Sequence, residues 1–227
     1  MPNASQVEIS EPSRDESRAD LGLFLREIHA TKIGHLNSLH GRGRVLFTEG
    51  EPVRGVYILR SGRAIVSIVS SEGRVVLLRM AQAGDVLGLN SVLRDATYDT
   101  TVKTLEPCRT DFISRVELID LMQHSSAGAY AILRILSQEL TELTDRAKSL
   151  LLPQTVSGRL ARLLLEWSKD NGSRLDRILT HEEIAQMICT SRETVTRLLA
   201  AFSRQQVISV TSDSIQILDR NALEKLT

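Results

Sequence analysis

The segment from Leu179 to Asp219 constrains the fold more than any other part of the chain, because two short helices, a tight turn and a β-hairpin follow one another in it. Its start has the Thr-x-x-Glu pattern of a capping box, in which Thr180 and Glu183 each pair with a backbone N–H of the first helical turn. The apolar side of this helix comprises Ile184, Ala185, Met187 and Ile188. Cys189-Thr190-Ser191 then predicts a turn.

A second helix is predicted to begin at Ser191. Its apolar residues have the i, i+3, i+4, i+7 spacing of a buried helix face: Val195, Leu198, Leu199 and Phe202. Four polar side chains of the first turns are left facing outward: Arg192, Glu193, Thr196 and Arg197. Arginine binds guanine bidentately and a carboxylate accepts from the cytosine amino group, so this set suits the major groove of DNA. Helix-turn-helix proteins read bases with their second helix in this way.

Glu193 lies four residues before Arg197, so its carboxylate is also expected to hold that guanidinium group. The alternative is an ordinary solvated helix face that carries a Glu/Arg pair. The next residues favour DNA binding, because two β-prone runs, 207–210 and 215–218, flank a polar loop and predict a wing. Asp219 is expected to cap a final short helix.

At these residues the chain resembles the Crp/Fnr family of bacterial transcription regulators. Ser191 to Arg197 reads S-R-E-T-V-T-R, which is similar to the S-R-E-T-V-x-R of many recognition helices in that family. The resemblance implies base contacts from Arg192, Glu193 and Arg197 at TGTGA-like half-sites of an inverted repeat in double-stranded DNA. It also implies a phosphate contact from Ser191, and Thr180 and Thr196 complete the predicted DNA-binding set. Such regulators act as homodimers and more often activate transcription, through RNA polymerase, than repress it.

Amino-acid composition limits the other classes of protein to which the chain can belong. The chain has 227 residues and is 42% hydrophobic, enough for one or two cores. It lacks any run of 18 apolar residues and an apolar block near its start, so we expect a cytoplasmic protein without a membrane partner. Cys108 and Cys189 are too few for a disulfide framework or a four-cysteine metal site. Oxidation of Cys189, which would put negative charge near DNA phosphates, is a hypothesis against ordinary packing.

The net charge of zero does not by itself suggest nucleic acid binding. Its distribution is more informative, because residues 1–20 carry five acidic and two basic residues and are expected to form a disordered tail. Residues 153–227 carry ten basic and nine acidic residues, an excess of one positive charge. A specific dimer can bind DNA with so modest an excess if the basic residues share one face.

Short β-prone runs separated by glycines fill residues 44–115: 45–47, 56–59, 64–69, 75–78 and 101–105. They predict a small β-barrel or roll. The positions of Gly62 and of Gly84-Asp85 before strands resemble the cyclic-nucleotide-binding β-roll of the same family. The expected fold is therefore α+β, with an N-terminal double-stranded β-roll (21–115), a dimerisation helix (116–152) and a C-terminal winged helix-turn-helix (153–227).

The candidate effector pocket departs from the pattern of family members that bind cyclic AMP. Those carry a glutamate after a glycine for the ribose and, about ten residues later, an arginine for the phosphate. Here Gly88 is followed by Leu89, and the arginine position falls near Tyr98 and Asp99, whose carboxylate would repel a phosphate. We expect no tight cyclic AMP binding; a roll that serves only as a scaffold and a roll with a different ligand remain open. Asn90 leaves haem without an iron ligand, so no cofactor is predicted.

Between the roll and residue 153, apolar residues step by four and three over three heptads: Ala129, Leu133, Leu136, Leu140, Leu143, Ala147 and Leu150. Two copies of this helix should pair, and the interface is expected to comprise Leu133, Leu136, Leu140, Leu143, Ala147 and Leu150. The alternative is that the stripe packs on its own roll, as Ile132 and Ile135 suggest for part of it. Pro153 is expected to end the helix at a hinge.

Two other functional classes compete with a transcription regulator. One is a sensor of a cyclic nucleotide or another small ligand that acts through protein contacts. The other is an enzyme, for which the chain offers no P-loop, no G-x-S-x-G and no metal-spaced His/Glu set. The five histidines are expected to be surface or packing residues.

Overall fold

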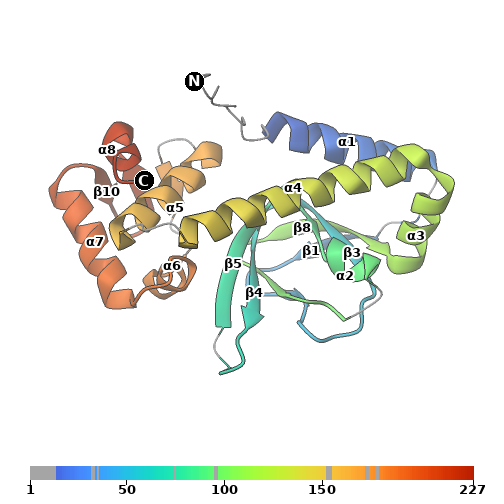
Figure 1. Ribbon diagram of the computed structural model, residues 1–227, viewed down its shortest axis with the longest axis horizontal. Helices are drawn as coiled ribbons and strands as arrows, with labels where there is room; N and C mark the ends of the chain where they lie inside the picture. Colours follow the sequence, from blue (N-terminus) through green and yellow to red (C-terminus); the bar gives the residue numbers. More distant parts are fainter. Residues whose placement is uncertain are drawn as a thin grey trace, which may run out of the picture.

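The computed structural model describes residues 14–31, 34, 36–73, 75–94, 97–151, 155–171, 174–176 and 179–227. A long helix, α4 (Ser126–Leu151), runs along much of the molecule and joins two parts. A β-rich part lies against its first half, and the helices α5 to α8 gather near its far end (Figure 1). The α+β architecture predicted from the sequence is confirmed.

The β-rich part is a roll of two four-stranded antiparallel sheets. In order, the sheets are β1 (Leu36–His40), β8 (Cys108–Ser114), β3 (Gly55–Ser61) and β6 (Val86–Leu87), and β2 (Val45–Phe47), β7 (Thr101–Thr104), β4 (Arg63–Val69) and β5 (Val75–Gln82). All five predicted strands are present. Strand β6 follows Gly84-Asp85, where a strand was expected; β1, β8 and the one-turn helix α2 (Leu89–Leu93) were not predicted, because their short or polar sequences carry no clear alternation.

A helix covers the roll where the sequence predicted only a tail. Helix α1 (Arg14–Ala30) includes residues 14–20, so the expected disorder was wrong for these positions, while residues 1–13 lie outside the described part of the chain. Phe24 and Ile28 are 0% and 2% exposed and pack with Val56 and Ile113 of the roll. This apolar burial outweighs the high charge of the helix start.

The predicted dimerisation helix is two helices. Helix α3 (Arg115–His124) begins with a capping box between Ser114 and Glu117, and the chain leaves helical geometry at Ser125 before α4 starts. The Ser125 hydroxyl accepts a hydrogen bond from the Gly128 N–H at 2.9 Å and donates to the Glu27 carboxylate of α1 at 2.7 Å. Ser125 thus caps α4 and ties it to α1.

Helix α4 has two apolar faces. Ala131 and Ile132 are fully buried against α1 and the roll. On the other face, Leu133, Leu140 and Leu143 are 59%, 65% and 53% exposed. Packing on the roll, one of the two alternatives, is therefore confirmed for the inner face, and pairing of two copies stays a prediction for the exposed face. Ala147 and Leu150 also lie on α4, and Pro153 lies outside the described residues.

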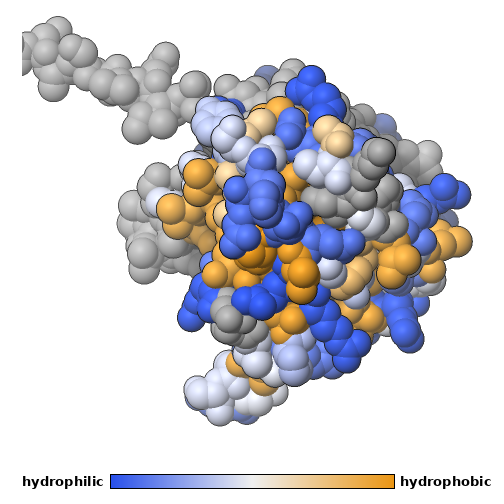
Figure 2. Space-filling model, turned by 90° about the vertical axis from the view of Figure 1, so that its right-hand side faces the viewer, coloured by the Kyte–Doolittle hydropathy of each residue, from blue (hydrophilic) through white to orange (hydrophobic). Residues whose placement is uncertain are grey.

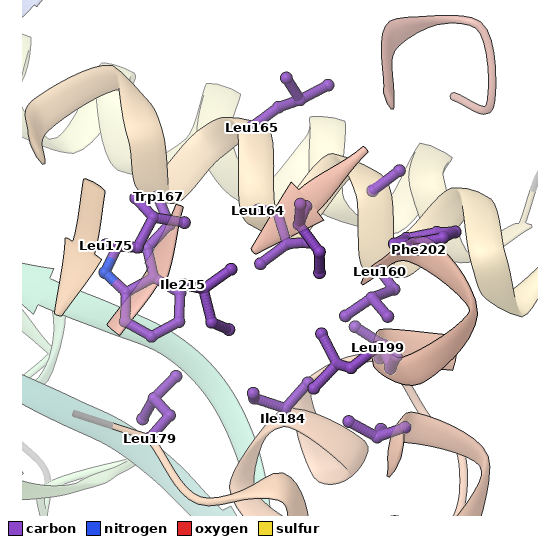
Figure 3. Packing of buried hydrophobic residues seen from close by; sticks show 14 of the residues in the cluster. Leu160, Leu164, Leu165, Trp167, Leu175, Leu179, Ile184, Leu199, Phe202 and Ile215 are labelled. Carbon is purple, nitrogen blue, oxygen red and sulfur yellow. The ribbon is translucent and has the colours of Figure 1, made fainter. Parts of the chain in front are cut away.

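The C-terminal part packs around a hydrophobic core, which Figure 3 shows from close by. Its elements are α5 (Val156–Asn171), β9 (Arg174–Asp176), α6 (His181–Met187), α7 (Arg192–Arg204), β10 (Ile208–Val210), β11 (Ser214–Ile217) and α8 (Arg220–Glu224). Leu160 and Leu164 of α5 face Ile184, Leu199 and Ile215 from three other elements (Figure 3). The wing has a third strand, β9, beside β11, which the sequence analysis did not predict.

The two parts touch through apolar side chains. Helix α6 contacts β5, and Ile65, Leu77 and Leu105 of the roll belong to the same buried cluster as Leu179 and Ile184. The first helix of the helix-turn-helix therefore rests on the roll.

Figure 2 views the opposite end of the molecule, away from the helix-turn-helix. Hydrophobic residues there form separate patches among hydrophilic ones. A large continuous apolar area marks an interaction surface more clearly than scattered residues do. The exposed leucines on the outer face of α4 therefore remain the candidate dimer interface.

Candidate DNA-binding site and effector pocket

At both ends of helix α6, a capping motif provides hydrogen-bond partners for backbone groups that have none within the helix. The exposed Thr180 side chain accepts from the Glu183 N–H, and the Glu183 carboxylate accepts from the Thr180 N–H at 2.7 Å, which confirms the predicted capping box. At the other end, the Thr190 N–H donates to the Ala185 carbonyl at 2.9 Å, the long bond of a Schellman motif. Arg159 of α5 donates to the Ile188 carbonyl at 2.8 Å. The turn between α6 and α7 is thereby fixed from both sides.

The turn contains one residue in a left-handed conformation. Cys189 has φ of 51°, which glycine adopts readily and other residues only at a cost. We therefore expect Cys189→Gly to raise the free energy of unfolding by about 1 kcal/mol. Chemical denaturation checks this, with Thr190→Gly as the control. Thr190 is not among the residues with positive φ, so its replacement should destabilise. Equal effects of the two changes would contradict the explanation.

Helix α7 buries one face and exposes the other. The Ser191 side chain accepts from the Thr194 N–H and caps the helix, as predicted. Val195, Leu199 and Phe202 are at most 4% exposed, and Leu198 packs partly buried against the same core. The residues of the opposite face are exposed, as are Ser191 and Thr180. This face comprises Arg192, Glu193, Thr196 and Arg197. All six predicted DNA-binding residues are thus accessible, five of them on α7 and its N-cap and one, Thr180, at the N-cap of α6.

The electrostatics of Glu193 differ from the expectation. Its carboxylate accepts hydrogen bonds from its own backbone N–H and from the Ser191 side chain, and these, with nearby Arg192, lower its pKa. The helix N-terminus attracts the negative charge. The expected ion pair with Arg197 is absent here, although both residues are described. Glu193 is therefore ionised at neutral pH and held at the start of the reading face.

From the sequence, His181 was expected to be an ordinary surface or packing residue. In the structure its Nδ1 lies 2.9 Å from the hydroxyl oxygen of Thr196, so the first residue of α6 contacts the exposed face of α7. The contact spans 15 positions of sequence. A sequence pattern that looks only at i, i+3 and i, i+4 neighbours could not have found it.

The roll interior is filled at the position of the candidate effector pocket. Gly88 has φ of 83°, and a side chain there would come within 2.9 Å of the Tyr98 ring. Leu89 and Tyr98 are 1% and 3% exposed. The Tyr98 ring stacks on Phe47 with 4.0 Å between centroids, and its hydroxyl donates to the Gly55 carbonyl at 2.7 Å. Aromatic side chains occupy space that a ligand would need.

The Asp99 carboxylate faces the same loop. It accepts hydrogen bonds from the Asn90 side-chain amide at 2.6 Å and from the Ser91 hydroxyl at 2.9 Å. These two donors hold a negative charge beside the N-terminus of α2. An anionic ligand would meet repulsion there instead of the guanidinium that phosphate recognition favours.

Among the described residues, no group of three or more His, Cys, Asp or Glu side chains could hold a metal ion. His40 of β1 is hydrogen-bonded to the Thr110 hydroxyl at 2.9 Å. His35 lies outside the described residues.

A charged cluster joins the roll to the inner face of α4. Arg79 of β5 is ion-paired with Asp85 and lies 3.7 Å from the Glu139 carboxylate. These residues line a cavity of about 50 Å³ together with Glu142. Burial raises the pKa of Glu139 to about 7, against the opposing attraction of Arg79, and repulsion from Asp85 adds to the increase.

This pKa predicts that stability depends on pH. A carboxyl group whose pKa is raised in the folded state favours folding below its unfolded value of 4.5, and the benefit is lost as the pH rises through about 7. Glu139→Gln should therefore be more stable than the wild type at pH 8 by about 3 kcal/mol, with little difference at pH 4.5. Urea denaturation at both pH values tests this. Glu72→Gln, an exposed change in the β4–β5 turn, serves as control.

Similarity to known proteins agrees with this geometry. Residues 40–125 match the cyclic nucleotide-binding domain, and residues 158–226 match the Crp-like helix-turn-helix domain. The chain belongs to the Crp/Fnr family. The family consists of transcription regulators, and the DNA-binding helix-turn-helix of this member is the segment described above.

Individual relatives cover most of the chain. The CRP-like cAMP-activated global transcriptional regulator of Mycobacterium tuberculosis is 29% identical over 190 residues, 81% of this chain and 84% of its own. The anaerobic regulatory protein of Bacillus subtilis is 25% identical, over 77% of this chain and 76% of its own. The structure of FixK2 from Bradyrhizobium japonicum has the same fold, with a TM-score of 0.77 and 20% identity over 86% of this chain and 98% of that one.

The helices can also be compared with the length of a membrane span. No helix in the described part of the chain is both long and apolar enough to cross a membrane.

Proposed function

We propose that this Crp/Fnr member is a homodimeric transcription regulator that binds an inverted-repeat operator without needing cyclic AMP. The observation that carries the proposal is the exposed polar face of α7, set on a helix whose other face is buried. A capped N-terminus directs this face outward, which is the geometry that a recognition helix needs to enter the major groove.

Each residue of this face has a role in the proposal. Arg192 and Arg197 bind guanines of TGTGA-like half-sites, and Glu193 accepts from the amino group of a cytosine. Ser191 and Thr180 lie at the N-termini of α7 and α6, where backbone N–H groups favour phosphate. Thr196 lies on the same exposed face, one turn after Arg192.

The exposed leucines of α4 support the homodimer. A partner helix that covers Leu133, Leu140 and Leu143 would remove apolar surface from water and place two recognition helices about a two-fold axis. An inverted repeat has the same symmetry. The partly buried Leu136 and the predicted positions Ala147 and Leu150 continue the seam. In the cytoplasm such a dimer would act on transcription, as an activator that contacts RNA polymerase, and no catalytic activity is part of the proposal.

The filled roll supports independence from cyclic AMP. Tyr98 and Leu89 occupy the roll interior and Asp99 presents a negative charge, so this position offers neither space for a ligand nor recognition of an anion. The Mycobacterium tuberculosis relative is described as cAMP-activated, and this chain would differ from it.

Titration calorimetry of the purified protein with cyclic AMP tests this part of the proposal. We expect no saturable heat at ligand concentrations up to about 1 mM, since a filled pocket must be opened before anything binds. A dissociation constant in the micromolar range would show that Tyr98 moves aside and would contradict the proposal.

A further inference from the structure

We propose that His181 is a positioning residue for Thr196: it fixes the Thr196 hydroxyl so that this side chain reads thymine through its methyl group. The inference deepens the proposed function and rests on it, because it assumes that the exposed face of α7 contacts bases. It concerns one base pair in each half-site.

The direction of two hydrogen bonds carries the first step. The Thr196 hydroxyl lies 3.0 Å from the backbone carbonyl of Arg192, which can only accept, so the hydroxyl proton points to that carbonyl. The same oxygen lies 2.9 Å from His181 Nδ1. Because the hydroxyl has a single proton, both contacts are hydrogen bonds only in the tautomer that carries its hydrogen on Nδ1. The geometry thus assigns the hydrogen to His181 Nδ1 and makes Thr196 its acceptor.

These two hydrogen bonds limit which groups of the Thr196 side chain can still contact a base. Its proton is used, so it cannot donate to guanine O6 or N7, to adenine N7 or to thymine O4. One lone pair is used by His181, and the side chain cannot rotate without losing both bonds. The exposed side chain then offers a base one hydroxyl lone pair, which can accept from the amino group of adenine or cytosine, and its methyl group. In the major groove, thymine is the one base that presents a methyl group of its own.

The third step is the rigidity of the support. His181 is the first residue of α6, whose start is fixed by the capping box of Thr180 and Glu183. The imidazole therefore reaches Thr196 from an element that is itself held in place. Both side chains are at least partly exposed, so the pair lies at the surface where DNA would dock.

The experiment uses an operator selected by the full-length protein and measures the loss of affinity when deoxyuridine replaces thymine, one position at a time. For the wild type we expect about a fourfold loss at one symmetry-related pair of thymines, which corresponds to one buried methyl group. Thr196→Val keeps the methyl group and should keep this sensitivity. Thr196→Ser keeps the hydroxyl but lacks the methyl group, and should bind thymine and uracil operators equally.

The ratio of affinities for the thymine and uracil operators also tests the role of His181. His181→Ala should reduce the preference for thymine over uracil to below twofold, because the Thr196 side chain is then free to rotate. His181→Asn carries an amide N–H that can replace the Nδ1 donor, so it should restore most of the preference. A role in helix stability alone would not move this ratio, since it compares two DNAs with one protein.

The outcomes are distinguishable. If no sequence-specific DNA can be selected, the proposed function fails and the inference fails with it. If an operator is bound but uracil is tolerated at every position, or if Thr196→Ser keeps the preference and Thr196→Val loses it, the function stands and the role of the methyl group is refuted. If the wild type discriminates but His181→Ala does so equally, the positioning role of His181 is refuted.

Discussion

Leu140→Glu is expected to convert the dimer into a monomer and to lower operator affinity by at least about 100-fold. Leu140 is 65% exposed in the single chain and lies in the seam between Leu133 and Leu143. In a symmetric dimer the substitution would bury two like charges close to each other, and it removes apolar surface from both copies. Without the dimer, each half-site must be bound separately, so the gain from simultaneous binding is lost.

Sedimentation equilibrium gives the association state, and fluorescence anisotropy with a labelled operator gives the affinity. The matched control is Val116→Glu on α3, because Val116 is 76% exposed and equally apolar but lies outside the seam. The control should remain dimeric and bind normally. If Leu140→Glu stays dimeric while Val116→Glu dissociates, the interface lies elsewhere on the molecule.

The second large effect is expected from Glu193→Ala. Removal of the carboxylate should relax discrimination at one base pair per half-site, by roughly five- to 150-fold, the range of a good contact to a base edge. The fixed position of Glu193 beside the helix N-terminus and its lowered pKa keep it charged, so the change removes a pre-oriented acceptor.

Selection from random DNA before and after the substitution measures this effect. Glu182→Ala removes an exposed carboxylate from the first turn of α6, outside the reading face, and should leave the selected sequence unchanged. If Glu193→Ala selects the same sequence as the wild type, its base-reading role is refuted.

Local signals explain what the sequence could predict. The capping patterns at Thr180, Ser191 and Asp219 each mark a helix start that the structure contains, because caps depend on only four neighbouring residues. The apolar periodicity of α7 identified its buried face for the same reason. The opposite, exposed face of α7 could therefore be predicted as the candidate site.

Features that depend on long-range contacts could not be predicted from the sequence. Strand β8 is largely polar at Cys108–Ser114, and it forms because β1 and β3 pair with it from both sides. Ser125, where α3 and α4 are separated, donates a hydrogen bond to Glu27, which is 98 positions away. His181 and Thr196 meet only once α6 and α7 have packed together. In each case the partners are far apart in the sequence, so no local sequence pattern links them.

The central claim is that this dimer recognises an inverted repeat without cyclic AMP. The most direct test selects binding sites from random duplex DNA with the purified, ligand-free protein and again with cyclic AMP, at one fixed salt concentration because salt alone changes affinity strongly. The account predicts the same G-containing inverted repeat in both selections. A repeat recovered only in the presence of cyclic AMP would contradict it and would mean that Tyr98, Leu89 and Asp99 do not close the pocket.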